Sequence, residues 1–192
     1  MNGMGHNNGP TMESGRAWRK HVWTKARADL LPRLPIEILR TRVARARELG
    51  LDYKTYASVR ASTGRDVVGF LFSTNALRVL KTLSVPPSHA AKLAAMQNCS
   101  RIAVVQPPLS AEAIARANAR LIDGATAAPL FTANWPETRG AIRQAVQLTK
   151  SPADAVLLIG DTAVEREWSH AGRLAGYLEA EQFFGKVAVN EL

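Results

Sequence analysis

Three short, continuous runs of mainly apolar residues constrain the fold of this chain more than any other feature. They cover Val67–Phe72, Arg101–Val105 and Ala155–Ile159, and they are rich in β-branched side chains. A strand that is apolar on both faces is typical of a parallel sheet covered by helices. Each run is far shorter than the roughly 20 residues that cross a bilayer, so we expect no membrane partner. The runs predict an α/β fold with a short, mostly parallel, three-stranded sheet.

Helical patterns separate these runs. The alternation of strand and helix predicts helices on both faces of the sheet, and therefore a small three-layer α/β domain over residues 66–192. The apolar residues of segment 123–134 have no clear periodicity, so we expect a loop there. Such a loop could cover a cleft. The helices are expected over roughly residues 75–83, 88–97, 110–122, 135–147 and 164–176.

The first third of the chain follows a different pattern. Residues 1–14 combine Gly, Pro and Asn without apolar periodicity, which predicts a disordered arm. Residues 15–65 predict a trihelical module, in which Asp52 is the N-cap of the last helix and Gly64 ends that helix. Apolar residues at helical spacing predict the three helices over about residues 16–31, 35–50 and 53–62.

The positive charge is concentrated in this module. The chain has 25 Lys and Arg against 16 Asp and Glu, a formal net charge of +9. Residues 1–65 hold 13 of the basic and 5 of the acidic residues, and residues 66–192 hold 12 and 11. This asymmetry indicates a polyanionic partner for the N-terminal part. A single cysteine, Cys99, excludes an intramolecular disulfide and fits a reducing compartment, so we expect a cytoplasmic protein.

Residues 46–59 have the spacing of two helices joined by a tight turn. Ala46 is small enough for the helices to approach, and Gly50 suits the positive φ of the turn. Tyr56 and Val59 then supply apolar contacts for the second helix. The segment resembles the helix-turn-helix of bacterial DNA-binding proteins, which implies a nucleic-acid partner. The side chains expected to contact bases or phosphates are Arg40, Arg42, Arg45, Arg47, Tyr53, Lys54, Ser58 and Arg60.

The same segment also fits plainer interpretations. A helix that ends in Leu-Gly-Leu before another helix is an ordinary helical hairpin, and its arginines can form a solvated face. Asp52 sits where a phosphate would approach, which counts against DNA. The remaining partner hypotheses are another protein, anchored by Tyr53 and Tyr56, and a second copy of this chain.

The third apolar run leads into the sharpest local motif. Gly-Asp follows the run directly, a second acidic residue comes four residues after the Asp, and an Ala-Gly pair comes later. This segment resembles the fourth motif of haloacid-dehalogenase-like hydrolases. The resemblance implies, as an alternative function, a hydrolase or phosphotransferase that uses Mg²⁺ as cofactor. The matching residues are Gly160, Asp161, Glu165, Ala171 and Gly172, preceded by Lys150 and by Ser151 to Asp154.

The first strand lacks the residues that this family uses for chemistry. The family carries a nucleophilic Asp and a second Asp just after that strand, where this chain has Ser73, Thr74 and Asn75. No aspartyl-phosphate can form without the nucleophile, so we expect a non-catalytic relative without a cofactor. Thr162 and Glu165 also have the spacing of a capping box, which starts a helix and holds no metal. We favour the capping box.

Polar residues at the ends of the three strands would meet at one edge of a parallel sheet. Helix N-termini at that edge could help them bind a small anion or nucleotide. No glycine-rich phosphate loop and no zinc-ligand spacing is present. The sequence favours a nucleic-acid-binding or regulatory protein, with an enzyme or a protein-binding adaptor as alternatives. The candidate ligand residues are Ser73, Thr74, Asp161, Thr162 and Glu165, with Gln106 at the same edge.

Overall fold

The computed structural model describes residues 34–80 and 82–185. The predicted arm and the first predicted helix of the module lie outside these residues. One compact unit begins at Arg40, within helix α2 (Ile36–Glu48), and takes in all later described residues. Residues 34–39 belong to a separate unit and hold the first part of α2. The fold and the site described below belong to the unit that begins at Arg40.

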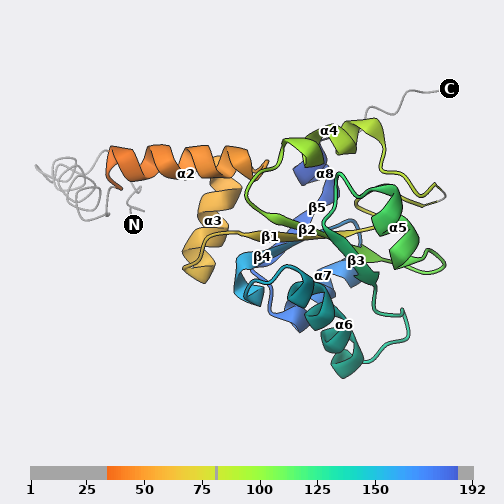
Figure 1. Ribbon diagram of the computed structural model, residues 1–192. Helices are drawn as coiled ribbons and strands as arrows, with labels where there is room; N and C mark the ends of the chain where they lie inside the picture. The colour runs from red at the N-terminus through yellow and green to blue at the C-terminus, as the bar shows by residue number, and fades with distance from the viewer. Residues whose placement is uncertain (1–33, 81, 186–192) are drawn as a thin grey trace, which may run out of the picture. The chain divides into compact units, whose positions relative to one another are not determined.

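Five parallel strands form one sheet in this unit (Figure 1). The sheet order is β3-β2-β1-β4-β5, so β1 lies in the centre and Leu71 pairs with Ile102 on one side and Leu158 on the other. The α/β fold class and the three predicted strands are confirmed. The strands are β1 (Gly69–Ser73), β2 (Ser100–Val105), β3 (Gly124–Ala127), β4 (Val156–Gly160) and β5 (Gly176–Glu179).

The two outer strands correct the sequence prediction. β3 lies within segment 123–134, where a loop is predicted, and β5 begins where a helix over 164–176 is predicted to end. Each pairs with a single neighbour, β2 or β4. Every residue of β3 and most of β5 stay at least partly exposed. Edge strands of this kind show no continuous apolar run, which is why the pattern for buried strands did not detect them.

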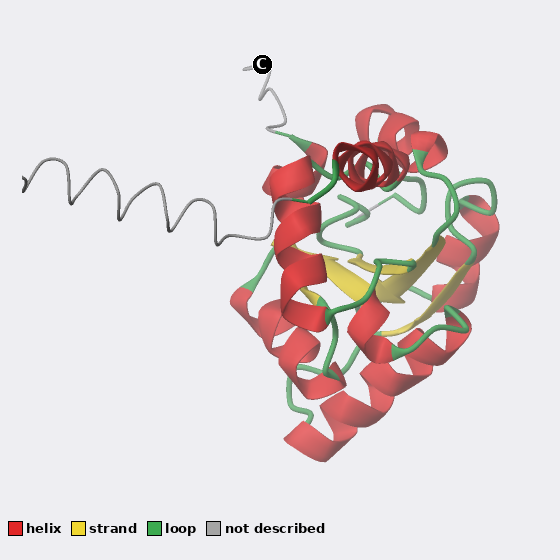
Figure 2. Cartoon of the chain, turned by 90° about the vertical axis from the view of Figure 1, so that its left-hand side faces the viewer, coloured by secondary structure: helices red, strands yellow, loops and turns green. Residues whose placement is uncertain are grey.

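The helices form a layer on each face of the sheet (Figures 1 and 2). Phe70 and Phe72 of β1 point into one core, which they share with α4, α5 and α8, while Leu71 points into the opposite core with α6 and α7. Side chains alternate in this way because successive residues of a strand face opposite sides of the sheet. The helices are α4 (Pro87–Ala95), α5 (Ala111–Ala117), α6 (Trp135–Leu148), α7 (Ala163–Gly172) and α8 (Ala180–Phe184), with a 3₁₀ turn at Ala153–Ala155.

The second and third helices of the predicted module contribute side chains, Ala46 and Tyr56, to the apolar core of the unit. As predicted, α3 (Tyr53–Thr63) is capped by Asp52, which accepts a 2.9 Å hydrogen bond from Thr55 N, and it ends at Gly64 with φ 71°. Tyr56 of α3 is 1% exposed and shares its core with Phe70 and Phe72. The sequence placed a domain boundary after residue 65, whereas the apolar core continues across that position.

The helix predicted over residues 75–83 does not form in the described part of that segment. A turn follows β1 instead, in which Leu77 N donates to the Ser73 carbonyl at 3.0 Å. Arg78 then takes a φ of 56°, which a right-handed helix cannot accommodate. The turn holds Asn75 close to the carboxyl end of β1.

Candidate functional site

The carboxyl ends of β1 and β4 lie side by side at the centre of the sheet. The chain leaves β1 toward β2 on one side and leaves β4 toward β5 on the other, so the strand order reverses between them. Ligands of open α/β sheets bind outside the carboxyl ends of the strands at such a reversal. The residues that follow β1, β2 and β4 are therefore the first place to look for a site.

A buried carboxylate, Glu165, organises this edge of the sheet. Its side chain is 0% exposed. Oε2 accepts backbone N–H bonds from Asp161 at 2.6 Å and Thr162 at 3.0 Å, and Oε1 accepts from Asn75 Nδ2 at 3.0 Å and Gln106 Nε2 at 2.7 Å. All four donors are neutral N–H groups. The carboxylate thereby ties together the segments that follow β1, β2 and β4.

The capping-box interpretation of Thr162 and Glu165 is confirmed. Thr162 Oγ1 accepts from Glu165 N at 3.2 Å, and the Glu165 carboxylate accepts from the backbone N–H of Thr162. A negative charge at this position also interacts favourably with the positive end of the α7 dipole. Gly160 is required beside it, because a Cβ there would lie 2.6 Å from Tyr177 Cε2 and 3.0 Å from Glu165 Oε2.

The other candidate ligand residues at this edge are held by internal contacts. Ser73 and Thr74 are buried, and their hydroxyl oxygens accept backbone N–H bonds from Ala76 and from Gln106. Asp161 forms an ion pair with Arg78. The structure brings all five candidates to one edge of the sheet, but each of them is already engaged in a hydrogen bond or an ion pair within the unit.

This arrangement does not fit the Mg²⁺ site that the haloacid-dehalogenase resemblance implies. A metal needs open carboxylate oxygens. Each oxygen of Glu165 already accepts two N–H bonds, and the Asp161 carboxylate is paired with a guanidinium. Among the described residues, no three His, Cys, Asp or Glu side chains gather in a way that could hold a metal ion.

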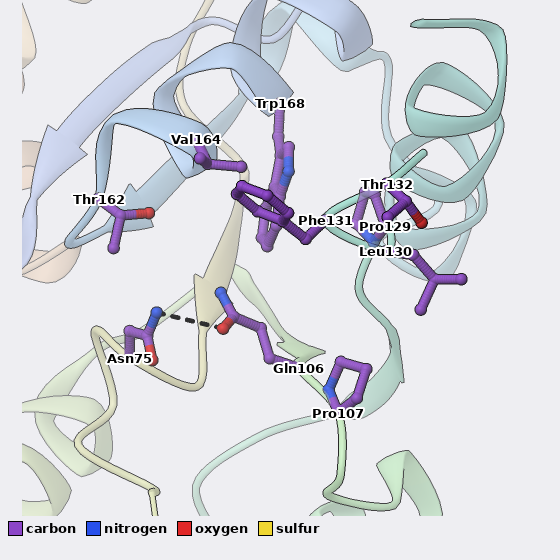
Figure 3. A pocket seen from close by; sticks show the side chains of 10 residues that line it. All are labelled: Asn75, Gln106, Pro107, Pro129, Leu130, Phe131, Thr132, Thr162, Val164 and Trp168. Atoms are coloured by element: carbon purple, nitrogen blue, oxygen red, sulfur yellow. Dashed lines mark hydrogen bonds between the residues drawn. The ribbon is translucent and has the colours of Figure 1, made fainter. Parts of the chain in front are cut away.

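A cavity of about 520 Å³ opens beside Glu165 (Figure 3). Its floor carries Asn75 and Gln106, and Thr162 lies on one side of it. The loop after β3 supplies the opposite wall, which agrees with the expectation that this segment covers a cleft. None of the described residues that line the cavity is charged. They are Asn75, Gln106, Pro107, Pro129, Leu130, Phe131, Thr132, Thr162, Val164 and Trp168.

Most of these cavity residues were not predicted as site residues. Asn75 lies three residues after the first predicted strand, Val67–Phe72, so its position near a strand end was a usable signal. Leu130 and Phe131 are 61% and 88% exposed, an unusual position for large apolar side chains. Their apolar character in a segment without helix or strand pattern was the second signal.

Some of the arginines predicted to contact phosphates are bonded to other residues of the unit, and others are exposed. Arg45 is held inside the unit, donating to Asp66 and Glu48 at 2.9 Å each and to the carbonyls of Val67 and Asn98 at 3.0 Å each. Burial disfavours its charged form, but the hydrogen bonds and charges of Glu48 and Asp66 outweigh this effect and raise the Arg45 pKa. Arg45 therefore connects α2 to the residues that come just before β1 and β2.

Arg60 is engaged in the same way. Its Nη1 donates to the Tyr56 hydroxyl at 3.3 Å and lies 3.6 Å from Asp66 Oδ1. The Tyr56 hydroxyl in turn donates to Asp66 at 2.7 Å, and burial together with that carboxylate raises the pKa of Tyr56. Tyr56 is thus a core residue and cannot anchor a protein partner from the surface. Of the other predicted contacts, Arg42 and Tyr53 are half-buried, while Arg40, Arg47, Lys54 and Ser58 are exposed.

Comparison with known proteins identifies no relative. No protein-family model, no curated protein and no solved structure matches this chain. No helix among the described residues is both long and apolar enough to cross a membrane. Because a fold alone does not define an activity, the function has to be inferred from the site.

Proposed function

We propose that the α/β unit is a non-catalytic, small-molecule-binding domain with a regulatory role. Its ligand occupies the cavity at the carboxyl edge of the sheet, next to Glu165. The observation that carries this proposal is the location of a mainly apolar cavity of about 520 Å³ where the strand order reverses. That volume is within the roughly 300–1,000 Å³ that is typical of small-molecule sites.

The chemistry of the lining supports binding rather than catalysis. Leu130, Phe131, Val164 and Trp168 supply apolar surface. Glu165, whose carboxylate bonds the side chains of two of the lining residues, already accepts four hydrogen bonds and cannot act as a base or a metal ligand without dismantling the start of α7. A domain of this kind would respond to its ligand without converting it.

Blocking the cavity tests the proposal. Val164 lines the cavity and is 43% exposed, so Val164→Trp should fill the entrance at little cost in stability. We expect indole to shift backbone amide signals around the cavity in the ¹H–¹⁵N NMR spectrum of the wild-type protein. The variant should bind indole at least about tenfold more weakly, which corresponds to about 1.4 kcal/mol.

Leu148→Trp is the matched control. Leu148 is 47% exposed and does not line the cavity, so this variant should bind indole like the wild type. Equal affinity of Val164→Trp and the wild type, or loss of binding in both variants, would refute the location of the site.

Nucleic-acid binding is a second candidate, favoured by the exposure of Arg47 and Lys54 at the ends of α2 and α3 that adjoin the turn between them. A truncated chain that starts at residue 66 is not a suitable test, because it would lose Tyr56 from the core. Substitutions at the surface are better suited.

We expect Arg47→Gln/Lys54→Gln to weaken binding to duplex DNA. The slope of log K against log salt should fall by about 1 for each phosphate that the variant no longer neutralises. Arg116→Gln/Arg120→Gln, at two exposed arginines in and just after α5, is the control and should leave the slope unchanged. Identical salt dependence of the wild type and both double variants would eliminate this candidate.

A further inference from the structure

The two side-chain amides on the cavity floor are oriented by Glu165. A carboxylate only accepts hydrogen bonds, so both amides must turn their NH₂ groups toward it. Asn75 Nδ2 donates to Glu165 Oε1 at 3.0 Å and to Gln106 Oε1 at 3.3 Å, which uses both of its hydrogens. Gln106 Nε2 donates to Glu165 Oε1 at 2.7 Å, which uses one of its two. The dashed line in Figure 3 marks the bond between the amides.

This orientation leaves a defined set of polar groups for a ligand. The Asn75 carbonyl oxygen, Oδ1, accepts no hydrogen bond from the described residues. Gln106 Nε2 retains one N–H, and the Thr162 hydroxyl accepts from Glu165 N but keeps its own hydrogen. All three residues line the cavity. The residues that line the cavity therefore carry one free side-chain carbonyl acceptor together with neutral donors.

The charge around the floor restricts the ligand further. Glu165 is buried beside the cavity, and burial together with its negative charge raises the pKa of the neighbouring Tyr177 to about 12. An anionic ligand would meet the same repulsion without a cationic side chain in the lining to offset it. A cationic ligand would lose solvation and find both oxygens of Glu165 already bonded. A neutral ligand avoids both costs.

We infer that the ligand is a neutral compound with an amide edge, which donates an N–H to Asn75 Oδ1 and accepts a hydrogen bond from Gln106 or Thr162. Its apolar part lies against Leu130, Phe131 and Val164. This inference rests on the proposed function and names the chemical class that the cavity takes. Primary carboxamides and lactams meet the description.

Three probes of matched shape separate the possibilities: benzamide, benzoate and toluene, each titrated into the wild-type protein and followed by ¹H–¹⁵N NMR. We expect benzamide to bind at least about tenfold more tightly than toluene, because it satisfies two hydrogen bonds that toluene leaves unmade. Benzoate has the same shape as benzamide but carries a charge, and it should bind more weakly than benzamide.

A pair of variants assigns the preference to the cavity floor. Asn75→Ser should reduce the advantage of benzamide over toluene, because the bond to Asn75 Oδ1 is lost, whereas Leu130→Ala should weaken both probes to a similar extent. Benzoate or toluene binding as tightly as benzamide would overturn the amide inference while leaving a small-molecule site in place. If the cavity bound none of the three probes, the proposed function itself would be wrong.

Discussion

Replacing Glu165 by alanine is expected to destabilise the unit by about 3–5 kcal/mol. Four N–H groups donate to this carboxylate, and a hydrogen bond to a charged group contributes about 1.5–3 kcal/mol. The expected loss of stability is smaller than the sum of four such contributions, because Asn75 and Gln106 line the cavity and can bond water instead. The measurement is the free energy of unfolding from urea denaturation, followed by circular dichroism.

Glu167→Ala is the matched control for this experiment. Glu167 lies on the same helix, α7, but its side chain is exposed, so its removal should change the free energy of unfolding by no more than about 0.5 kcal/mol. Thr162→Ala should have an intermediate effect of about 1 kcal/mol, the usual cost of removing an N-cap. Unchanged or increased stability of Glu165→Ala would contradict the structural role. Residues that are held for chemistry at a cost in stability behave in that way.

Replacing Tyr56 by alanine should also cost about 3–5 kcal/mol, the usual range for removing a buried aromatic side chain. Tyr56 is 1% exposed, packs in the core that contains Phe70 and Phe72, and donates to Asp66 at 2.7 Å. The loss should affect the whole unit in one cooperative transition, because α3 and the sheet share this core. Urea denaturation followed by two probes, far-UV circular dichroism and backbone amide signals of β1, measures both the cost and the cooperativity.

Variants of the exposed face of α3 provide the comparison. Lys54→Ala and Ser58→Ala alter side chains that lie in solvent, so each should change stability by less than about 0.5 kcal/mol. Tyr56→Phe should fall between these and Tyr56→Ala, because it retains the ring and removes one hydrogen bond. If Tyr56→Ala melted α3 alone and left the β1 signals unchanged, α3 would be a separate module after all.

The central part of the fold could be predicted from the sequence because its three strands are buried on both faces. Such strands are apolar at every position, as in Val156–Gly160, and this pattern is visible without knowledge of their neighbours. The outer strands lack this signal. Gly124–Ala127 is half-exposed, and its strand character comes from pairing with β2. The turn at Arg78 was missed for a related reason, since a positive φ at arginine has no sequence signature.

The candidate site was predictable only where it is local. Thr162 and Glu165 are three residues apart, so the capping box could be identified from spacing. The amides that complete the site come from positions 90 and 59 residues away from Glu165, and no periodicity relates positions so far apart. In a similar way, the positive charge of the predicted module did not show which of its arginines are paired with acidic residues of the same unit. Arg45 and Arg60 look like surface cations in the sequence, but both bond to Asp66, which follows them in the chain.

The side-chain NH₂ signals of Asn75 and Gln106 in the ¹H–¹⁵N NMR spectrum test most directly whether this edge of the sheet binds a neutral ligand rather than a metal. Both groups bond to Glu165 and line the cavity, so they respond to either kind of occupant. We expect saturating benzamide to shift both signals and millimolar MgCl₂ to leave them in place. Signals that move with Mg²⁺ and not with benzamide would contradict the proposal and indicate a metal site at Glu165.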